Sequence, residues 1–339
     1  MANIKLVAER AGVSVATASR ALSGKGPVSE ETRRRVLEAA RALDFTPNLL
    51  ARGLARRRTM TLAIVLPDIS NPFFPAIARG VEDAASTGGY AVFLCNTDNL
   101  YENEESYLAA LRRRMVDGII FIPATERAEQ YVDLLAGWTV VLVDRDVPGL
   151  PADAVLVDNR AGCREATRYL IGLGHRHIAH LAGPPGLATA EQRKQGYVEA
   201  LAEAGILPHQ PWVLHGPFDF GGGYRGMKRL LETRPRPTAV VCANDLIAMG
   251  AIKACQEAGL RVPEDISLTG FDDIFVSSMI HPPLTTVVQP GHLMGVKAAE
   301  LLLARLEGRK PQEDGGPVRV VLTPHLVVRG SCGPPPRRG

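Results

Sequence analysis

The chain has 339 residues and a formal net charge of +3, and its 46% hydrophobic and 22% charged residues are ordinary for a soluble globular protein of two or three domains. Its longest apolar runs are about as long as a β-strand, far short of the roughly 20 residues that a membrane helix needs. Lys5, Glu9 and Arg10 interrupt any apolar segment of a secretory signal. The five cysteines are scattered without a C-x-x-C motif, which predicts reduced thiols in a cytoplasmic protein.

The charge is distributed unevenly along the chain. Residues 1–58 carry 12 Lys and Arg against 5 Asp and Glu, whereas the remaining residues carry 27 against 31. A basic head on a mildly acidic body is typical of a nucleic-acid-binding protein with a separate second domain. A solvated basic tail is the alternative, but this head is rich in helix formers and apolar residues, which disordered tails usually lack.

Three short helices are predicted within the head. Residues 4–11 have the apolar periodicity of a helix, Gly12 ends that helix, and Ser14 can cap a second helix with the sequence SVATASRAL. A third helix begins near Ser29 and is predicted to turn its apolar face, Val36, Leu37, Ala40 and Leu43, toward the other two. Two helices joined by a turn that contains glycine match the helix-turn-helix pattern, although a plain packing unit has the same spacing.

The side chains of the second helix favour DNA binding over that plain packing unit. Thr17 and Ser19 are short donors suited to phosphate oxygens, and Arg20 can donate two hydrogen bonds to a guanine edge in the major groove. Val15 and Ala16 offer apolar surface to a thymine methyl group.

Residues 4–59 closely resemble the headpiece of the lactose/galactose-repressor family, and the resemblance extends to about residue 331. It implies that the first two residues of the recognition helix, and the arginine at its end, read bases. The headpiece residues that we expect at the DNA are Ser14, Val15, Ala16, Thr17, Ser19 and Arg20.

A further short helix is predicted after residue 47. Asn48 can cap the sequence LLARGLA, which is too short to be a stable helix alone and should form only against DNA or a second copy of the chain. In the resembled family this segment is the hinge helix, which implies that Leu54 wedges into the minor groove with Ala51 and Arg52 beside it. Gly53 departs from good helix sequence and costs up to about 1 kcal/mol relative to alanine.

From residue 60 onward, short apolar runs alternate with amphipathic stretches. The predicted strands are residues 62–66, 90–95, 118–122, 140–144, 177–182, 238–243 and 266–271. Helical periodicity is found over 102–115, 162–173, 191–204 and 245–258. This alternation predicts an α/β fold with parallel sheets that are covered on both faces and joined by right-handed crossovers.

Ligands of such sheets bind beyond the carboxyl ends of the strands. The polar and aromatic residues that directly follow a predicted strand are Asn71, Phe73, Phe74, Asp144, Arg145, Asn244, Asp245 and Asp272. Each has an ordinary explanation as a turn, core, capping or surface residue, but their shared position at strand ends favours a binding site.

The body resembles the periplasmic sugar-binding-protein fold of the same repressor family. Compared with a ribose-binding protein, this resemblance implies an effector site of Asn71, Phe73, Phe74, Asp144, Arg145, Thr189, Arg193, Phe218, Asn244, Asp272 and Gln289. Aromatic rings stack on the C–H faces of a sugar, and planar carboxylate, amide and guanidinium groups each hold two hydroxyls. Ribose or a close pentose is therefore the favoured effector. Leu187 stands where purine-binding members carry an arginine, which counts against a purine.

Two motifs resemble sequence signatures of other functions. Gly221, Gly223 and Gly226 spell G-x-G-x-x-G, but the strand that should precede a dinucleotide site ends at His215, several residues too early. Three histidines over 175–180 suggest a metal, but no cysteine or carboxylate completes a ligand set. We therefore expect neither a dehydrogenase nor any metal or cofactor.

The predicted organisation is a DNA-binding headpiece over 1–47, a hinge over 48–59, an effector domain over 60–331 and a disordered tail over 332–339. One lobe comprises about 60–158 with 290–317, and the other about 159–289 with 318–331. We expect a cytoplasmic, nucleoid-associated protein that binds a near-palindromic operator and a small sugar. We expect a homodimer, because the tail lacks the leucine heptads that build tetramers. The alternatives are a purine-, nucleoside- or sugar-phosphate-responsive regulator of the same family and, more distantly, a sugar-binding module without a regulatory role.

Overall fold

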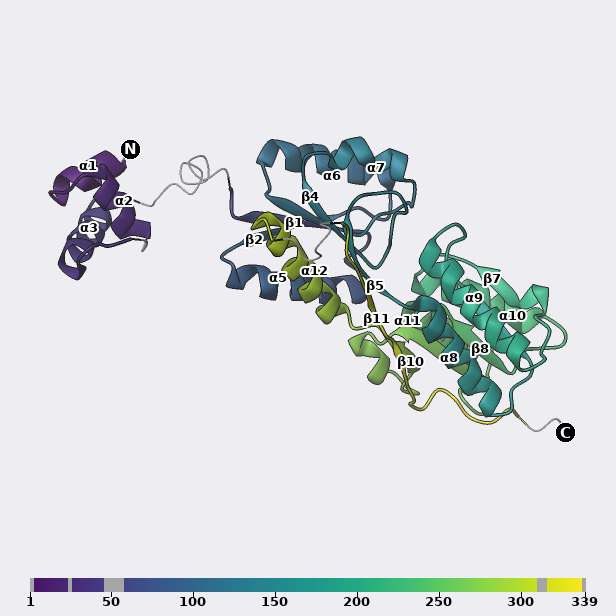
Figure 1. Ribbon diagram of the computed structural model, residues 1–339. Helices are drawn as coiled ribbons and strands as arrows, with labels where there is room; N and C mark the ends of the chain where they lie inside the picture. Colours follow the sequence, from purple (N-terminus) through teal and green to yellow (C-terminus); the bar gives the residue numbers. More distant parts are fainter. Residues whose placement is uncertain (1–2, 24–25, 46–57, 310–315, 337–339) are drawn as a thin grey trace. The chain divides into compact units, whose positions relative to one another are not determined.

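The computed structural model describes residues 3–23, 26–45, 58–309 and 316–336, and it divides into two compact units, Met1–Met60 and Thr61–Gly339 (Figure 1). The predicted hinge contacts of Asn48, Ala51, Arg52 and Leu54 lie outside the described residues. No helix among the described residues is long and apolar enough to cross a membrane.

The described residues of the first unit form a bundle of three helices, α1 (Ile4–Arg10), α2 (Val15–Ser23) and α3 (Glu30–Ala42). Its core is small and made largely of alanine and valine: Val7, Ala8, Ala11, Ala18, Ala21, Val36, Ala39 and Ala40. The predicted apolar face of α3 was wrong at Leu37, which is 40% exposed, whereas Ala39 is buried in its stead. Helices with such small core side chains can approach one another closely.

The turn between α1 and α2 follows directly from the sequence. Gly12 has a φ of +62°, a left-handed conformation that glycine adopts without steric cost. The Ser14 hydroxyl then accepts a hydrogen bond of 3.1 Å from the backbone N–H of Thr17, which caps α2 as predicted. Asn3 and Ser29 cap α1 and α3 in the same manner.

The second unit contains two six-stranded sheets. The first has the strand order β11-β5-β4-β3-β1-β2, with every pair parallel. Its strands are β1 (Thr61–Leu66), β2 (Ala91–Asn96), β3 (Gly118–Phe121), β4 (Thr139–Val143), β5 (Asp153–Val157) and β11 (Arg319–Leu322). Four helices flank this sheet, α5 (Phe73–Thr87), α6 (Tyr101–Arg114), α7 (Ala128–Leu135) and α12 (Gly291–Leu306).

The second sheet has the order β12-β10-β9-β8-β6-β7. Its strands are β6 (Ile178–Ala182), β7 (Val213–His215), β8 (Ala239–Cys242), β9 (Ser267–Asp272), β10 (Thr285–Val288) and β12 (His325–Val327). Its flanking helices are α8 (Asn159–Gly172), α9 (Ala188–Glu203), α10 (Phe220–Glu232) and α11 (Asp245–Glu257), with short 3₁₀ turns η1 (Gln210–Trp212) and η2 (Phe275–Ser278). Only β12 among these strands runs antiparallel to its neighbour.

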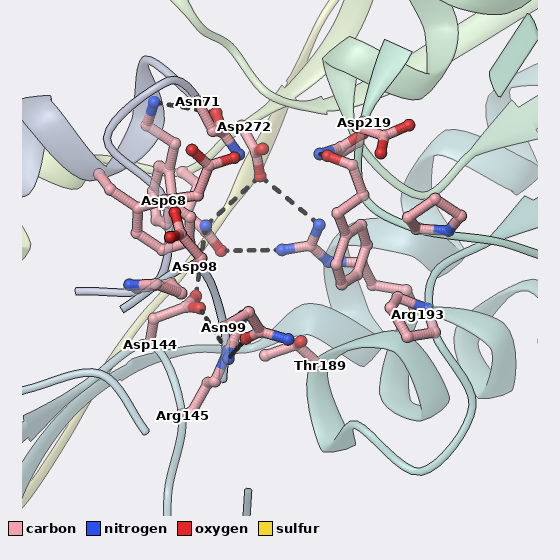
Figure 2. Close-up of a pocket in the computed structure, with 18 residues that line it drawn as sticks. Asp68, Asn71, Asp98, Asn99, Asp144, Arg145, Thr189, Arg193, Asp219 and Asp272 are labelled. Carbon is pink, nitrogen blue, oxygen red and sulfur yellow. Dashed lines mark hydrogen bonds and ion pairs between the residues drawn. The ribbon is translucent and has the colours of Figure 1, made fainter. Parts of the chain in front are cut away.

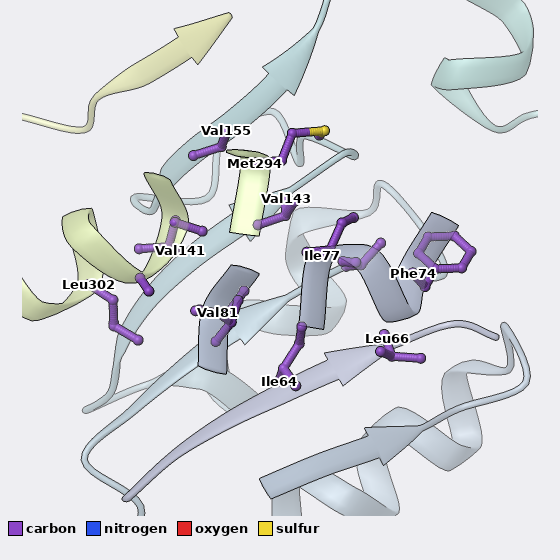
Figure 3. Close-up of a cluster of buried hydrophobic side chains, with 14 of the residues drawn as sticks. Ile64, Leu66, Phe74, Ile77, Val81, Val141, Val143, Val155, Met294 and Leu302 are labelled. Carbon is purple, nitrogen blue, oxygen red and sulfur yellow. The ribbon is translucent and has the colours of Figure 1, made fainter. Parts of the chain in front are cut away.

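Each sheet is covered on both faces, as the continuous apolar strands predicted. Along β1, Leu62, Ile64 and Leu66 face α5 and α12, whereas Ala63 and Val65 face α6 and α7. Figure 3 shows Ile64 and Leu66 packed with residues of α5 and α12 in the first of these cores. The α/β fold class is therefore confirmed, and each of the seven predicted strands agrees with an observed strand to within one residue at either end.

Two predicted boundaries were wrong. Residues 319–322 were assigned to the second lobe, but β11 pairs in parallel with β5 of the first sheet, so the last crossover follows Leu322. The tail was expected to be disordered from residue 332, but Gly333 donates to the Ser267 hydroxyl (3.0 Å) and accepts from the His175 ring (2.9 Å). These bonds hold the described part of the tail against β9.

Candidate functional site

The exposed face of α2 carries the predicted base-reading residues. Val15, Ala16, Ser19 and Arg20 are exposed, while Ala18 on the same helix is fully buried in the three-helix core. The helix therefore divides into a packing face and a solvent-exposed face. Thr17 is half-buried, and its hydroxyl lies 2.9 Å from that of Ser14.

The second unit contains a cavity of about 400 Å³ whose walls come from both lobes (Figure 2). All eleven predicted effector residues line it, together with Pro67, Asp68, Asp98, Asn99, Pro184, Pro217 and Asp219. Every predicted residue except Phe218 is buried.

The convergence follows from topology. Asp144 and Arg145 follow β4 of the first sheet, whereas Asp272 ends β9 and Gln289 follows β10 of the second sheet. The carboxyl ends of parallel strands gather these residues within each sheet, and the two groups line the same cavity. Asn244 follows β8 and caps α11 by accepting a bond of 2.9 Å from the Ile247 N–H. The aromatic residues Phe73 and Phe74 begin α5, and their rings meet edge-to-face at 5.3 Å.

Arg193 is the most highly connected side chain of the cavity. Its Nε donates to Asn159 Oδ1 (2.8 Å), its Nη1 donates to the carbonyl of Ala243 (2.6 Å), and its Nη2 donates to Gln289 Oε1 (3.3 Å). Nη1 also lies 3.5 Å from a carboxylate oxygen of Asp272. The guanidinium is thus held rigidly, with its Cζ 3.8 Å from the ring centroid of Phe271.

Arg145 is positioned differently, because part of its bonding capacity is unused. Its Nη1 donates to Asn99 Oδ1 (2.6 Å) and to the carbonyl of Pro123 (2.8 Å). Its Nε is buried without a hydrogen-bond partner and lies 3.8 Å from the Asp144 carboxylate. A fully buried donor without a hydrogen-bond partner is costly, and the attraction of the Asp144 carboxylate partly offsets that cost.

Burial perturbs the ionisable groups of the cavity. It raises the pKa of Asp144 above its ordinary value, against the opposing attraction of Arg145 and Arg193. Burial also raises the pKa of Asp272, and Arg193 opposes that shift. Neighbouring Asp245 has its pKa raised to about 6 by burial, although it accepts hydrogen bonds from Ser277 (2.6 Å), Thr286 (2.5 Å) and the Ile274 N–H (2.9 Å). Asp245 thus anchors the loop after β9 and does not line the cavity.

Seven lining residues were missed by the sequence reasoning. Asp68 and the pair Asp98–Asn99 follow β1 and β2, so the rule that selected Asp144 could have found them. Asp219 caps α10 by accepting a bond of 2.6 Å from the Gly222 N–H, a role that the sequence alone does not separate from ligand binding.

The glycine motif at 221–226 and the histidines at 175–180 both have structural roles. Gly221, Gly223 and Gly226 all lie inside α10, and a Cβ on Gly223 would come within 2.0 Å of the Ile247 carbonyl oxygen on α11. That glycine serves close helix packing. The His175 ring bonds Thr238 and Ser267, and His180 bonds the Val241 carbonyl and stacks on Tyr197.

Comparisons with known proteins agree with both units. The profile of bacterial regulatory proteins of the lacI family matches residues 3–48, and that of the periplasmic binding protein-like domain matches residues 167–332. The ribose operon repressor of Halalkalibacterium halodurans is 39% identical over 334 residues, which span 97% of this chain and 96% of that protein. The transcriptional repressor PurR of Pasteurella multocida is 37% identical over 334 residues, 98% of each chain.

Solved structures give the same result. The lac repressor dimer bound to operator and the anti-inducer ONPF is similar with a TM-score of 0.86 and 28% identity, over 97% of this chain and 98% of that one. A LacI family regulator from Enterococcus faecium with bound ribose is similar with a TM-score of 0.73 and 32% identity, over 81% and 99%. The chain belongs to the LacI family of bacterial transcription regulators, whose members are not enzymes.

Proposed function

We propose that this protein is a repressor of a carbohydrate-utilisation operon, and that a small sugar, with ribose or a related pentose favoured, controls its affinity for operator DNA. The observation that carries the proposal is the meeting of eleven residues, chosen for their likeness to sugar-contacting groups, in one cavity. The ribose operon repressor and the ribose-bound regulator among its relatives support the same effector.

The chemistry of the cavity suits a polyhydroxylated ring. Two aspartate–arginine pairs, Asp144 with Arg145 and Asp272 with Arg193, stand beside the apolar rings of Phe73 and Phe74. Planar charged groups bind adjacent hydroxyls in pairs, whereas the rings cover the C–H face of the sugar. A site of this kind discriminates strongly against an analogue that lacks a hydroxyl, because a buried group would lose its partner.

DNA binding is assigned to the exposed face of α2. Val15, Ala16 and Arg20 would read bases, while Ser14, Thr17 and Ser19 would hold phosphates. The segment 48–59 would be the hinge, with Asn48 as its cap and Ala51, Arg52 and Leu54 at the minor groove. This arrangement makes the hinge the element that both ligands influence, so operator should weaken sugar binding by the same factor as sugar weakens operator binding.

We further propose that the protein acts as a dimer, which the operator-bound lac repressor dimer supports. β2 is an edge strand, and Phe93 and Leu94 on it are 43% and 42% exposed. Around η2, Phe275 and Met279 are 66% and 72% exposed. Exposed apolar side chains at a sheet edge favour burial against a second copy of the chain.

A purine- or nucleoside-responsive regulator is the alternative, which the similarity to PurR favours. Leu187 counts against it, because purine-binding members carry an arginine there and this leucine is buried.

A thermal-shift series with ribose, other pentoses, hexoses, purines and nucleosides tests the effector. A ligand at a hundredfold over its dissociation constant adds roughly 2.7 kcal/mol to the stability of the folded state, which raises the melting temperature by several degrees. A rise with ribose is the expected result. If the melting temperature rises only with purines or nucleosides, the effector is a purine or nucleoside and the pentose assignment is wrong.

A further inference from the structure

The cavity contains more negative than positive charge. Its lining includes five carboxylates, Asp68, Asp98, Asp144, Asp219 and Asp272, and two arginines, Arg145 and Arg193, but no lysine. Each arginine already faces one buried aspartate, at 3.8 Å and 3.5 Å. The carboxylates of Asp68, Asp98 and Asp219, which we call the acidic rim, are therefore left without a counter-charge in the cavity.

The acidic rim is bonded only through neutral donors. Asp68 accepts from the hydroxyl (2.6 Å) and the N–H (2.8 Å) of Ser70, and Asp98 accepts from the side-chain amide of Asn96 (2.7 Å). Asp219 accepts from the Gly222 N–H. Arg225 Nη1 and Asp219 Oδ1 both lie near Gly221, but the two side chains form no ion pair within 4.0 Å. None of the three forms a salt bridge with any residue that the structure describes. Asp68 and Asp98 belong to the first lobe and Asp219 to the second, as Figure 2 shows.

Protonation of the buried carboxyls would not reverse this balance. Burial raises the pKa of both Asp144 and Asp272. If both were neutral, three rim carboxylates would still exceed two guanidinium groups. The cavity therefore has no net positive charge in either case.

At four helix starts around the cavity, one N–H group already has a side-chain acceptor. The N-terminus of a helix binds phosphate through its free N–H groups. Here Asn71 accepts from Phe73 N–H (3.1 Å), Asp219 caps α10, and Asn244 caps α11. At α9, a carboxylate oxygen of Glu126, on the loop between β3 and α7 of the other lobe, accepts from the Ala188 N–H.

Glu126 is the most informative of these caps. It places a carboxylate at the start of α9, one residue before Thr189 of the cavity, where a phosphate would otherwise find a positive helix end.

We infer that this cavity selects an uncharged polyhydroxylated effector and excludes phosphorylated or carboxylated ones, with the acidic rim of Asp68, Asp98 and Asp219 as the determinant. This inference rests on the proposed function of the cavity as an effector site. It removes the sugar-phosphate alternative that the sequence left open.

Matched ligand pairs test the inference on the full-length protein. Isothermal titration would compare ribose with ribose 5-phosphate, glucose with glucose 6-phosphate, and adenosine with AMP. The neutral member should bind at least about tenfold more tightly, since three charges within a nanometre or so repel a dianion even in a watery site. Raising the salt concentration from about 0.05 M to about 0.5 M should reduce this difference in affinity between the neutral and the anionic ligand.

The acidic rim is tested by the triple variant D68N/D98N/D219N. Asparagine can accept the same hydrogen bonds, tolerates the left-handed backbone at residue 98 (φ +53°) and caps helices well, so the variant should fold. The ratio of neutral to anionic affinity should fall at least about tenfold, and its salt dependence should disappear. D133N, which changes an exposed aspartate on α7 outside the cavity, should leave the ratio unchanged.

The outcomes separate the two proposals. If adenosine or glucose binds and ribose does not, the pentose assignment fails while the charge selection stands. If an anionic member binds wild type as well as its neutral partner, or if the triple variant leaves the ratio unchanged, the acidic rim is not the determinant. If no member of any pair binds, both proposals fail.

Discussion

The two units place their functional residues in opposite environments. On α2 the predicted base-reading side chains Val15, Ala16 and Arg20 are exposed, and the core beneath them is made of alanine and valine. In the second unit the corresponding residues, such as Arg193 and Asp272, are buried and bonded to one another. A base-reading side chain can thus change without disturbing the fold, whereas a buried and bonded cavity side chain such as Arg193 cannot.

This contrast has a physical origin. DNA is a large partner that meets a convex surface, so its recognition requires side chains that stand free of the protein core. A small ligand must be surrounded, so its recognition groups lie in the interior and must satisfy one another while the ligand is absent. Function and stability should therefore be separable in the first unit and coupled in the second.

The largest expected effect is that of Arg193→Ala. It should abolish the response to effector and destabilise the second unit by about 3–5 kcal/mol, because the Asp272 carboxylate and Gln289 are left buried without their partner. Denaturant unfolding measures the loss. Arg168→Ala, which breaks an exposed ion pair with Glu203 on neighbouring helices, should change stability little. Equal losses of stability in the two variants would contradict the coupling of function and stability in the second unit.

Glu104, a buried carboxyl group on α6, gives the next effect. Burial raises the pKa of Glu104 to about 7, although the Tyr131 hydroxyl (2.6 Å) and the Ala124 N–H (2.7 Å) donate to it. A raised folded-state pKa means that its contribution to stability is present below about pH 4.5 and is lost as the pH rises through about 7. At pH 8, Glu104→Gln should therefore be more stable than wild type, by up to about 3 kcal/mol.

Denaturant unfolding of wild type and Glu104→Gln from pH 5 to pH 8 measures the difference in their free energies of unfolding. This difference isolates the contribution of Glu104, because the titration of Asp245 affects both proteins alike and cancels. The advantage of the variant should grow with pH. A difference that stays constant over this range would show that Glu104 does not titrate there.

Arg20→Ala should affect function far more than stability. The variant should lose about 1–3 kcal/mol of preference for an operator selected from a random duplex library. The stability of the headpiece should change little, because the side chain is exposed and its Nε bond to the Ala16 carbonyl (3.3 Å) lies at the surface of α2. Arg34→Ala, which changes an exposed arginine on α3 that is not expected to read bases, should leave this preference unchanged. Equal losses on both DNAs for Arg20→Ala would remove its base-reading role.

The sequence predicted the elements of the second unit better than their assembly. The strand at 319–322, RVVL, was not among the predicted strands, and nothing in so short a run specifies a partner, so its pairing with β5 was missed. The strand-end rule placed Asp144 and Asp272 in the cavity because both follow continuous apolar strands. It missed Asp68, Asp98 and Asp219 because aspartate is also an ordinary turn and capping residue.

Contacts between distant segments were beyond sequence reasoning for the same reason. Glu126 meets the start of α9 across 62 residues of chain, and neither end carries a local signal of the other. In the first unit the helical period placed Leu37 inside, but three small helices leave room for only a narrow apolar stripe, which Ala39 and Ala40 fill.

The smallest expected effect concerns the helix caps of the headpiece, where it distinguishes a role in stability from a role in DNA recognition. Ser14 caps α2 and Ser29 caps α3, each by accepting from the N–H three residues later. Replacing either by alanine should destabilise the headpiece by about 1 kcal/mol, which native-state hydrogen exchange of headpiece amides measures. Only Ser14→Ala should also weaken DNA binding after that loss is taken into account, because only Ser14 is predicted to contact a phosphate. If Ser29→Ala weakens DNA binding equally, the cap alone explains the effect, and the separation of stability from recognition fails at this position.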